Sequence, residues 1–444
     1  MKFTQSIFAA AFAFAAAAAF AAPVTTQGVG VGKHGDIQVA VTFDNGKIQK
    51  IDILKNAENP VLAKKVFTDL KDQIVAANSV QLDGISGATF TSKGLFAAVE
   101  DAAKKAGVTL GQADKKALKA AVKDLPKDAS YDVVVIGAGG AGFSAAIEAK
   151  NAGATVVLLE KMPQVGGNSL ISGAEMNAAK NWVQPKLGIT DDSPELHAKD
   201  TYLGGDKKGD MKVINVMTHN ALAGAEWCRD YLGVRFEPDN LFFFGGHSRK
   251  RALIPVGHTG TEFITKFQEK ADELGIPVIT NMKAEELIKD KSGRVVGVKA
   301  TMNGAEYSFN AKGGVVLATG GFGANPAMVK KYNPKIDERF KTTDAPGTTG
   351  EALYMAQRAG AELVNMQYIQ TYPICDPISG VIELIADARF DGAIMLNQEG
   401  KRFVEELGRR DVLSEAILDQ TGGYCWVLWN DKIGAVSNTV KEHP

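Results

Sequence analysis

Apolar and polar residues alternate in the first part of the chain as they do in half-buried strands. Residues 37–43 and 47–53 both follow this two-residue period, and the turn Asp44-Asn45-Gly46 separates them. An Asn-Gly step supplies the left-handed backbone conformations of a tight hairpin turn. The pattern predicts a β-hairpin.

Two segments with the apolar spacing of helices follow this hairpin. Residues 60–77 and 93–106 place apolar side chains three and four positions apart, as on one face of a helix. Together with the hairpin, they predict a small α+β domain over residues 24–110. Residues 111–129 are rich in lysine, aspartate and alanine, and we expect them to form a linker.

A βαβ unit is predicted after the linker, with a strand that begins at Tyr131. The apolar runs 133–137 and 155–160 flank a helical pattern over residues 141–152. Parallel strands joined by a helix are the building block of nucleotide-binding α/β folds. The sequence thus predicts an α/β, Rossmann-like domain over residues 130–444. Its mixed helical and strand patterns at residues 175–260 and 340–430 predict an inserted α+β capping region.

The first 22 residues follow a sequence pattern that differs from that of the two predicted domains. Lys2 precedes an apolar run over residues 7–22, which contains the Ala-x-Ala pattern Ala19-Phe20-Ala21 near its end. This is the order of a secretory signal peptide. A membrane anchor is the alternative, but a run of about 16 residues is short for a bilayer span. The sequence predicts export to the periplasm, cleavage near Ala21 and no stable membrane insertion.

The composition serves only to exclude some classes of partner and cofactor. The 444 residues are 45% hydrophobic and 23% charged, with a formal net charge of −1. Such a balance gives no reason to expect nucleic acid as a partner. Cys228, Cys375 and Cys425 form no Cys-x-x-Cys pair, so no c-type haem attachment is expected. The histidines show no metal-ligand spacing, so no metal site is expected.

A glycine triplet stands between the first strand and the helix of the βαβ unit. Gly137, Gly139 and Gly142 have the G-x-G-x-x-G spacing of a dinucleotide-binding turn. The first allows a tight turn, the second lets a pyrophosphate approach the backbone, and the third brings the helix against the strand. The phosphates then lie at the helix N-terminus. Glu160, at the end of the second strand, is placed to accept hydrogen bonds from ribose hydroxyls.

Two more glycine-rich segments, residues 161–169 and 315–322, extend this site. They resemble FAD-dependent oxidoreductases of the fumarate reductase type, and this resemblance implies non-covalent FAD as the cofactor. The residues expected to bind it are Gly137, Gly139, Gly140, Ala141, Gly142, Glu160, Lys161, Gly167, Asn168, Ser169, Thr319, Gly320 and Gly321.

A loop in the small domain carries a second flavin signature. The motif Asp83-Gly-Ile-Ser86-Gly87-Ala88-Thr89 resembles that of FMN-binding domains in sodium-pumping quinone reductase and Rnf-type subunits. In that family a flavin transferase esterifies the FMN phosphate to the threonine. The resemblance gives this covalent role to Thr89, with Ser86, Gly87 and Ala88 around it. The alternative is an ordinary turn that caps a helix beginning at Thr91 or Ser92.

Residues 367–373, 386–394 and 400–411 resemble the active-site strip of the soluble fumarate reductase family. In that family an arginine gives a proton to the alkene while the flavin gives hydride, and the resemblance assigns this role to Arg410. Arginine has so high a pKa that a relay must return its proton at once.

Asp387 and Arg389 are the candidates for this relay. The alternative for Arg409, Arg410 and Asp411 is a charge cluster on the surface, which would contribute little.

Two departures from the fumarate pattern bear on the substrate. Tyr372 stands where that family has histidine, and the carboxylate near the relay arginine has moved to Asp387. A phenol and a carboxylate can both bond the N–H groups of an imidazole. This pattern resembles the urocanate reductases. Glu175 is a candidate for the other imidazole nitrogen, with a structural carboxylate as the alternative, and His258 is expected to help position the substrate.

The resulting hypothesis is a periplasmic two-flavin reductase that converts urocanate into imidazole propionate. Electrons would enter through the FMN on Thr89 and pass to FAD. An external cytochrome-type donor would supply them, because the chain carries no haem motif. A fumarate, methacrylate or aryl-acrylate reductase of the same architecture is the first alternative.

The family that the chain resembles continues beyond the position of Pro444, through further substrate-binding residues and a closing flavin-binding strand. We therefore expect an FAD domain that is incomplete at its C-terminus, either because this is a truncated copy or because the sequence is part of a longer protein. If the chain is expressed as written, we expect weak FAD retention and little turnover. A non-catalytic flavin-binding electron-transfer protein is the second alternative.

Overall fold

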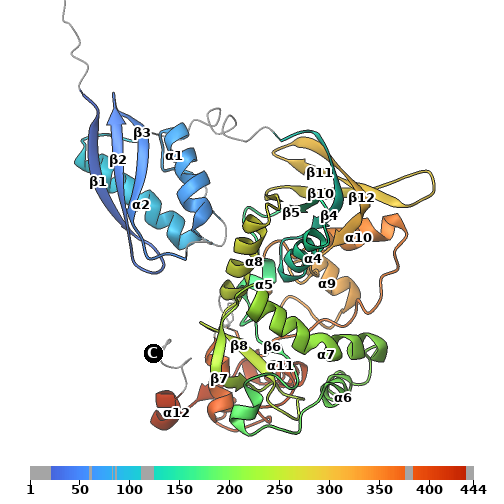
Figure 1. The fold of residues 1–444 in the computed structure, drawn as a ribbon. Helices are drawn as coiled ribbons and strands as arrows, with labels where there is room; N and C mark the ends of the chain where they lie inside the picture. The colour runs from blue at the N-terminus through green and yellow to red at the C-terminus, as the bar shows by residue number, and fades with distance from the viewer. Residues whose placement is uncertain are drawn as a thin grey trace, which may run out of the picture. The chain divides into compact units, whose positions relative to one another are not determined.

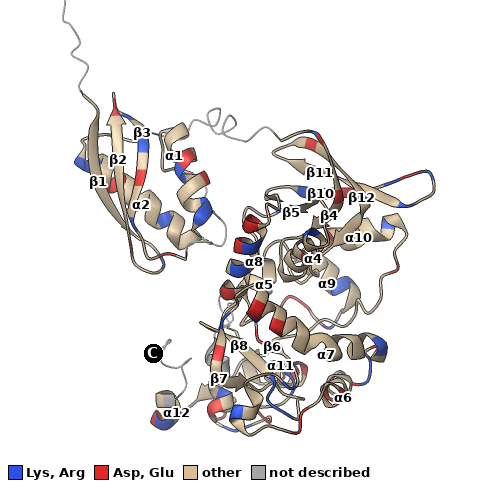
Figure 2. Cartoon of the chain, in the orientation of Figure 1, with Lys and Arg blue, Asp and Glu red and all other residues tan. Residues whose placement is uncertain are grey.

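The computed structural model describes residues 22–59, 63–82, 84–85, 88–111, 125–375 and 384–436 (Figure 1). The chain divides into an N-terminal unit that ends at Asp124 and a C-terminal unit that begins at Leu125. Acidic and basic residues are interspersed over both units (Figure 2), in line with the small net charge. No helix in these residues is both long and apolar enough to cross a membrane.

The N-terminal unit is an antiparallel sheet with helices packed on it. Its elements are β1 (Val24–Val31), β2 (Asp36–Asp44), β3 (Lys47–Lys55), a π-helical turn η1 (Val66–Leu70), α1 (Lys71–Ala77) and α2 (Thr89–Lys105). Strands β2 and β3 confirm the predicted hairpin, and β1 adds a third strand beside β2. The alternating residues Ile37, Val39 and Val41 are fully buried and form the core with α2. A Cβ on Gly28 would lie 1.9 Å from the Ala98 carbonyl oxygen, so only glycine lets β1 approach α2 this closely.

Helix α2 begins four residues earlier than the pattern of apolar residues predicts. The hydroxyl of Ser92 donates to the Ala88 carbonyl at 2.9 Å and accepts from the Ile85 N–H at 2.9 Å. These bonds continue the helical turn back to Thr89, which is the first helical residue. The helix therefore does not begin at Thr91 or Ser92, and among the described residues no side chain caps its N-terminus.

The C-terminal unit is built on a six-stranded sheet with the strand order β10-β11-β12-β4-β5-β9. The strands and the packed helices are β4 (Asp128–Ile136), α4 (Gly140–Asn151), β5 (Val156–Leu159), α5 (Gly167–Ile171), α8 (Thr261–Glu273), β9 (Val278–Ile279), β10 (Lys283–Lys289), β11 (Val295–Met302), β12 (Ala305–Leu317), α9 (Pro326–Tyr332) and α10 (Glu351–Ala359). Strand β4 is parallel to both β5 and β12, and α4 joins β4 to β5, which confirms the predicted βαβ unit. Strand β4 begins before Tyr131 because Asp128 and Ala129 pair with β12 within the segment predicted as linker.

The remaining elements of this unit form a cap. Figure 1 shows them gathered on one side of the large sheet. They are β6 (Met176–Asn177), η2 (Gln184–Leu187), α6 (Pro194–Gly204), α7 (Met211–Glu226), η3 (Trp227–Tyr231), β7 (Phe236–Phe242), β8 (Ala252–Pro255), η4 (Leu384–Asp391), β13 (Ile394–Leu396), α11 (Arg410–Leu418), η5 (Thr421–Gly423), β14 (Trp426–Leu428) and α12 (Asp431–Val436).

One expectation about the cap needs correction. Residues 340–430 were expected to belong to it, but α10 packs against β10 of the large sheet. Met355, on the apolar side of α10, is 3% exposed within the core of that sheet. The spacing of apolar residues indicates that a helix such as α10 has one buried face, but only the fold shows which surface that face covers.

Candidate functional site

The glycine turn has the geometry that a dinucleotide phosphate requires. Gly137 has a φ of +102°, and a Cβ there would lie 2.3 Å from the Ala318 carbonyl oxygen. A Cβ on Gly142 would lie 1.7 Å from the Gly137 carbonyl oxygen, so this glycine lets α4 close against the turn. Gly139 precedes the first turn of α4, and a Cβ on it would meet nothing closer than 3.7 Å. Gly140 and Ala141 open the helix, whose N-terminal N–H groups face the turn.

Glu160 supports this turn from the end of β5. Its carboxylate accepts hydrogen bonds from the backbone N–H groups of Ala138 at 2.9 Å and Met162 at 2.8 Å. One oxygen therefore fixes the glycine turn and the other fixes the chain after β5. Each keeps a second lone pair, so the predicted role with ribose hydroxyls remains compatible with these bonds.

The second glycine-rich turn lies beside the first. Gly166 and Gly167 have φ values of +112° and +47°, and α5 begins at Gly167. The hydroxyl of Ser169 accepts a hydrogen bond from the Gly140 N–H at 3.1 Å. Asn168 donates from its amide nitrogen to Asp344 at 2.6 Å. The Ser169 bond ties together two segments that the sequence analysis assigned to one cofactor, and the Asn168 bond adds a contact to a segment that it did not assign.

The third predicted segment follows β12. The Ala318 N–H donates to the Ile136 carbonyl at 2.8 Å, so Thr319 and Gly320 emerge next to the first glycine turn. Gly320 has a φ of +70°, and a Cβ on Gly321 would meet nothing within 4 Å. The three segments predicted to hold FAD therefore converge at one edge of the large sheet.

The residues at this edge fit a flavin dinucleotide. The turn leaves room at the backbone for a pyrophosphate, and the N-terminus of α4 favours negative charge. Both amide atoms of Gln164 are buried without a hydrogen-bond partner among the described residues. Gln164 lies in the loop from β5 to α5, two residues before Gly166, where a polar part of the cofactor can satisfy such a group.

Sequence reasoning missed one segment of this site, residues 344–351. Lys161, a predicted FAD residue, donates to Thr349 at 2.5 Å and to Glu351 at 2.9 Å. Burial raises the pKa of Glu351, but bonds from Thr349 and Lys161 outweigh it and lower that pKa to about 2. The Gly-Thr-Thr-Gly sequence that ends at Gly350, just before α10, is a signal that could have identified it.

The predicted substrate residues lie on the cap side of the C-terminal unit. Glu175 precedes β6, and its carboxylate lies 2.5 Å from Nε2 of His258. Burial alone would raise the pKa of Glu175, but the bond to His258 and the charge of Arg410 hold it below its ordinary value. His258 and Ala174 both adopt left-handed φ values, +48° and +57°, which are uncommon outside glycine and concentrate at functional sites.

An aromatic wall stands beside this pair, and sequence reasoning did not identify it. The ring of Phe242, at the end of β7, lies 5.7 Å from His258 and 5.4 Å from Phe390. The guanidinium of the buried Arg389 lies 4.9 Å from the Phe390 ring centroid. The run of aromatic residues at positions 242–244 was the available signal.

Arg410 lies on the first turn of α11, opposite Tyr372. Its guanidinium carbon is 5.0 Å from the centroid of the Tyr372 ring. Arg409 instead forms ion pairs with Asp206 and, at 2.5 Å, with Asp411. The two neighbouring arginines therefore differ: Arg409 belongs to a surface ion cluster, and Arg410 lies over the ring of the predicted substrate residue Tyr372.

Asp387 is placed only by its backbone, which lies in η4 two residues before Arg389. Ser86 and Gly87 of the FMN motif lie outside the described residues. No group of three or more metal-ligating side chains comes together in the described ranges.

A buried ion network supports the cap behind the aromatic wall. Arg251 is fully buried and donates to Asp192 at 2.8 Å and to Asp200 at 2.8 Å. It also lies 3.1 Å from Nδ1 of His247. Burial and the charge of Arg251 lower the pKa of the neighbouring His197 to about 4. This network fixes the loop that leads from β7 to β8.

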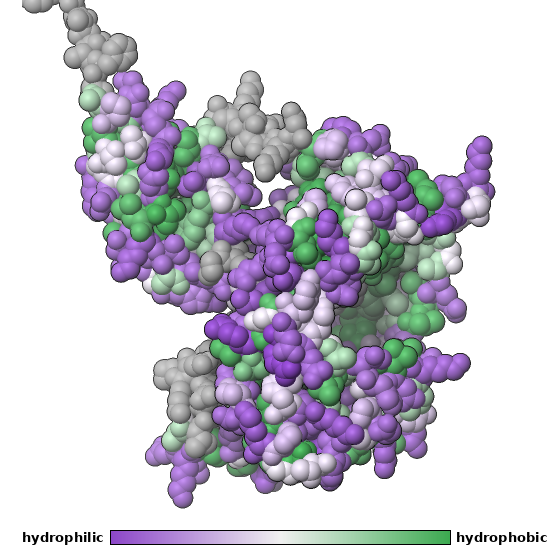
Figure 3. Space-filling model, in the orientation of Figure 1, coloured by the Kyte–Doolittle hydropathy of each residue, from purple (hydrophilic) through white to green (hydrophobic). Residues whose placement is uncertain are grey.

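The cap and the sheet enclose an open space. Figure 3 shows a hollow in the C-terminal unit, between the part that carries α10 and the part that carries α7, with apolar side chains inside it. Exposed apolar residues occur at the ends of the neighbouring strands, among them Leu317 at 39% and Val256 at 37%. Apolar lining is typical of sites that bind flat organic cofactors.

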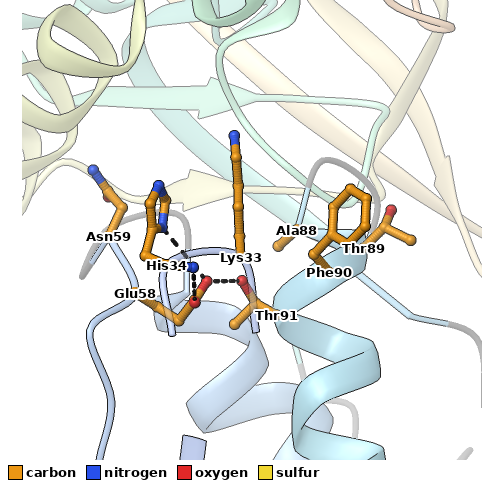
Figure 4. A pocket seen from close by; sticks show the side chains of 8 residues that line it. All are labelled: Lys33, His34, Glu58, Asn59, Ala88, Thr89, Phe90 and Thr91. Atoms are coloured by element: carbon orange, nitrogen blue, oxygen red, sulfur yellow. Dashed lines mark hydrogen bonds and ion pairs between the residues drawn. The ribbon is translucent and has the colours of Figure 1, made fainter. Parts of the chain in front are cut away.

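The N-terminal unit holds a separate pocket at Thr89 (Figure 4). Its volume is about 260 Å³, and its lining consists of Lys33, His34, Glu58, Asn59, Ala88, Thr89, Phe90 and Thr91. Thr89 is exposed on the first turn of α2, and the adjacent Phe90 is 64% exposed. An exposed hydroxyl beside an open pocket and an aromatic ring fits a flavin attached through its phosphate.

Comparison with known families gives two matches. A model of the FAD binding domain matches residues 132–437, and a model of the FMN-binding domain matches residues 32–104. The chain is 43% identical to a urocanate reductase of Eggerthella lenta over 91% of this chain and 67% of that protein.

Two further relatives are reductases of another substrate. A fumarate reductase (cytochrome) of Shewanella frigidimarina is 37% identical over 72% of this chain and 55% of that protein. A solved flavocytochrome c3 fumarate reductase in an open conformation superposes with a TM-score of 0.63 and 31% identity, covering 75% of this chain and 58% of that one. The chain thus spans one half to two thirds of the length of these relatives.

Proposed function

The chain belongs to the FAD-binding-domain family of the fumarate and urocanate reductases, with an FMN-binding domain at its N-terminus, and from this we propose that it reduces the carbon–carbon double bond of an α,β-unsaturated carboxylate. We propose urocanate as the substrate and imidazole propionate as the product. The observation that carries this proposal is the convergence of Arg410, Tyr372, Glu175 and His258 on the cap side of the unit.

The charges of these groups suit the imidazole end of urocanate. The Glu175 carboxylate and the Tyr372 phenol can hydrogen-bond an imidazole ring, which carries one or two N–H groups. The ring can also stack against Phe242 and Phe390, because aromatic faces and edges attract one another. A second carboxylate, as in fumarate, would be repelled by Glu175, whose low pKa keeps it charged.

FAD bound at the glycine turns would supply hydride to one alkene carbon. Arg410 would hold the proton for the other carbon and stabilise the negative charge that develops on the substrate. The charge of Arg410 also lowers the pKa of Glu175, so these two groups interact electrostatically. We propose that Asp387 and Arg389 return the proton to Arg410. The residues proposed to hold the FAD are those of the three glycine-rich segments, with Lys161 and Glu160 at its ribose end.

Electrons would enter through FMN esterified to Thr89. We propose that a flavin transferase attaches this FMN and that an external cytochrome-type protein donates the electrons. The support for attachment is the exposed Thr89 at the pocket and the matched FMN-binding domain.

We also propose that the chain is exported to the periplasm and cleaved near Ala21. The support is the order of Lys2, the apolar run and the small residues in the sequence. N-terminal sequencing of the mature protein after cell fractionation would test it, and an intact Met1 in the cytoplasmic fraction would contradict it.

A substrate comparison tests the proposed activity. The purified chain, with its flavin content measured, is given urocanate, fumarate, methacrylate and an aryl acrylate, with dithionite-reduced viologen as donor. We expect urocanate to have the highest kcat/KM, and Tyr372→Phe to lower it by about ten- to a hundredfold, the effect of a lost hydrogen bond between the protein and its substrate. Tyr368→Phe, which changes an exposed tyrosine four residues away, is the control.

The outcomes separate the alternatives. Faster reduction of fumarate than of urocanate would favour a fumarate reductase of the same architecture. Two bound flavins without reduction of any acid would favour an electron-transfer protein.

A further inference from the structure

The pocket at Thr89 contains a charge arrangement that attachment of a flavin does not require. Two of its lining residues, Lys33 and His34, belong to the loop between β1 and β2. Figure 4 shows the Lys33 side chain between the wall that carries His34 and Asn59 and the wall that carries Phe90. A lysine therefore stands within the space beside the flavin-attachment residue.

A buried carboxylate holds this loop against α2. Glu58 is 6% exposed and accepts a hydrogen bond from the backbone N–H of His34 at 2.8 Å. Its other oxygen accepts a bond from the hydroxyl of Thr91, two residues after Thr89. Burial raises the pKa of Glu58, but these bonds outweigh it and hold the pKa below its ordinary value. The loop of Lys33 and the first turn of α2 are thus fixed to one anchor.

Glu58 does not form an ion pair with the Lys33 amine, so it leaves the charge of Lys33 unpaired with a carboxylate in the described part of the chain. The Glu58 oxygens contact the backbone of Lys33 and His34, the hydroxyl of Thr91 and, at 3.8 Å, the His34 ring, and none of these contacts involves the Lys33 amine. Among the residues that the structure describes, no carboxylate lies within 4 Å of the Lys33 amine. A cation without a carboxylate partner attracts whatever negative charge enters the pocket.

We propose that Lys33 is a positioning cation for the flavin on Thr89 that stabilises its reduced form and so raises its reduction potential. This inference rests on the proposed attachment of FMN to Thr89. Two-electron reduction adds negative charge to the pyrimidine part of the flavin when only one proton is taken up. A nearby ammonium group favours this anion over the neutral oxidised ring. Electrons would then be held at the entry flavin until the second flavin accepts them.

The test is the FMN reduction potential of the full chain, coexpressed with a flavin transferase. Intact mass measures the covalent FMN, and a Thr89→Val chain, which lacks it, identifies the FMN part of the spectral titration. We expect Lys33→Gln to lower the potential by an amount equal to a threefold to tenfold change in the equilibrium, about 15 to 30 mV for two electrons. Lys33→Arg should keep the potential. The shift should shrink at high salt, because the side chain is exposed.

The matched control is Lys47→Gln. This lysine lies at the β2–β3 turn, at the opposite end of the same sheet, so its removal changes the net charge equally without changing the pocket. An FMN potential that is equal in Lys33→Gln and wild type, with FMN present in both, would overturn this inference alone. A wild-type chain without FMN on Thr89 would overturn the proposed attachment and this inference with it.

Discussion

The two candidate sites are assembled in different ways. The pocket at Thr89 is lined by three short segments, residues 33–34, 58–59 and 88–91, around one buried carboxylate. The substrate site draws on residues between positions 175 and 410, which come from β7, from η4, from α11 and from loops of the cap. A modification site needs one exposed hydroxyl and room for the donor. A reaction site needs several charges held at fixed distances, and only a large fold supplies these.

The difference also appears in the buried charges. In the N-terminal unit, Glu58 is satisfied by a backbone N–H and a hydroxyl, without a full ion pair. In the C-terminal unit, Arg251 is buried between the two carboxylates of Asp192 and Asp200. We therefore expect substitutions at the substrate side to affect turnover and stability much more than they affect FMN attachment.

The largest expected effect is on turnover. Arg410→Gln removes the proposed proton donor, and we expect kcat for urocanate to fall about 10²- to 10⁴-fold, the usual contribution of a general acid. The FMN content, measured by intact mass, should stay at the wild-type level. Arg409→Gln is the matched control, since Arg409 pairs with Asp206 and Asp411 on the surface, and we expect little change. Equal losses in the two variants would contradict a proton-donor role specific to Arg410.

How far the sequence predicts these sites depends on how local each one is. The hairpin turn at Asn45-Gly46 and the turn at Gly137 could be predicted because residues a few positions apart determine both. The buried network of Arg251 could not, because its partners Asp200 and Asp192 lie 51 and 59 residues away. An arginine in a polar stretch indicates a charge, and only the fold shows that it is fully buried.

The same limit explains what the sequence left open at the cofactor and substrate sites. The motif around Thr89 indicated a modification, but the presence of Lys33 in its pocket depends on how β1 and β2 are joined. Residues 344–351 were assigned to the cap, and the bond between Glu351 and Lys161 joins positions 190 residues apart, which no local pattern reveals. Phe242 and Phe390 meet only through packing of the cap.

The second effect is on stability, and it separates the two units. Arg251→Gln leaves two buried carboxylates without their cation, and we expect it to destabilise the C-terminal unit by about 3 to 5 kcal/mol. The unfolding transition of the N-terminal unit, followed through its FMN fluorescence, should not move. Arg249→Gln removes an exposed arginine paired with Asp191 and should change neither transition measurably. A shift of both transitions in Arg251→Gln would mean that the two units unfold together.

The smallest effect concerns Glu175. Glu175→Gln replaces the bond of a carboxylate to His258 with a weaker one, and we expect a loss of about 1 to 3 kcal/mol in unfolding free energy at pH 7. The folded-state pKa of Glu175 lies below the ordinary value of 4.5, so its stabilisation is complete above pH 4.5 and is lost as the pH falls through the folded-state pKa. The gap between wild type and Glu175→Gln, measured by urea unfolding, should therefore close on acidification below pH 4.5. A gap that stays constant down to the acid unfolding of both proteins would show that Glu175 does not stabilise the cap through its charge.

The KM of the Glu175→Gln variant for urocanate gives a second measurement, because the loss of charge should weaken imidazole binding while leaving FMN attachment at Thr89 unchanged.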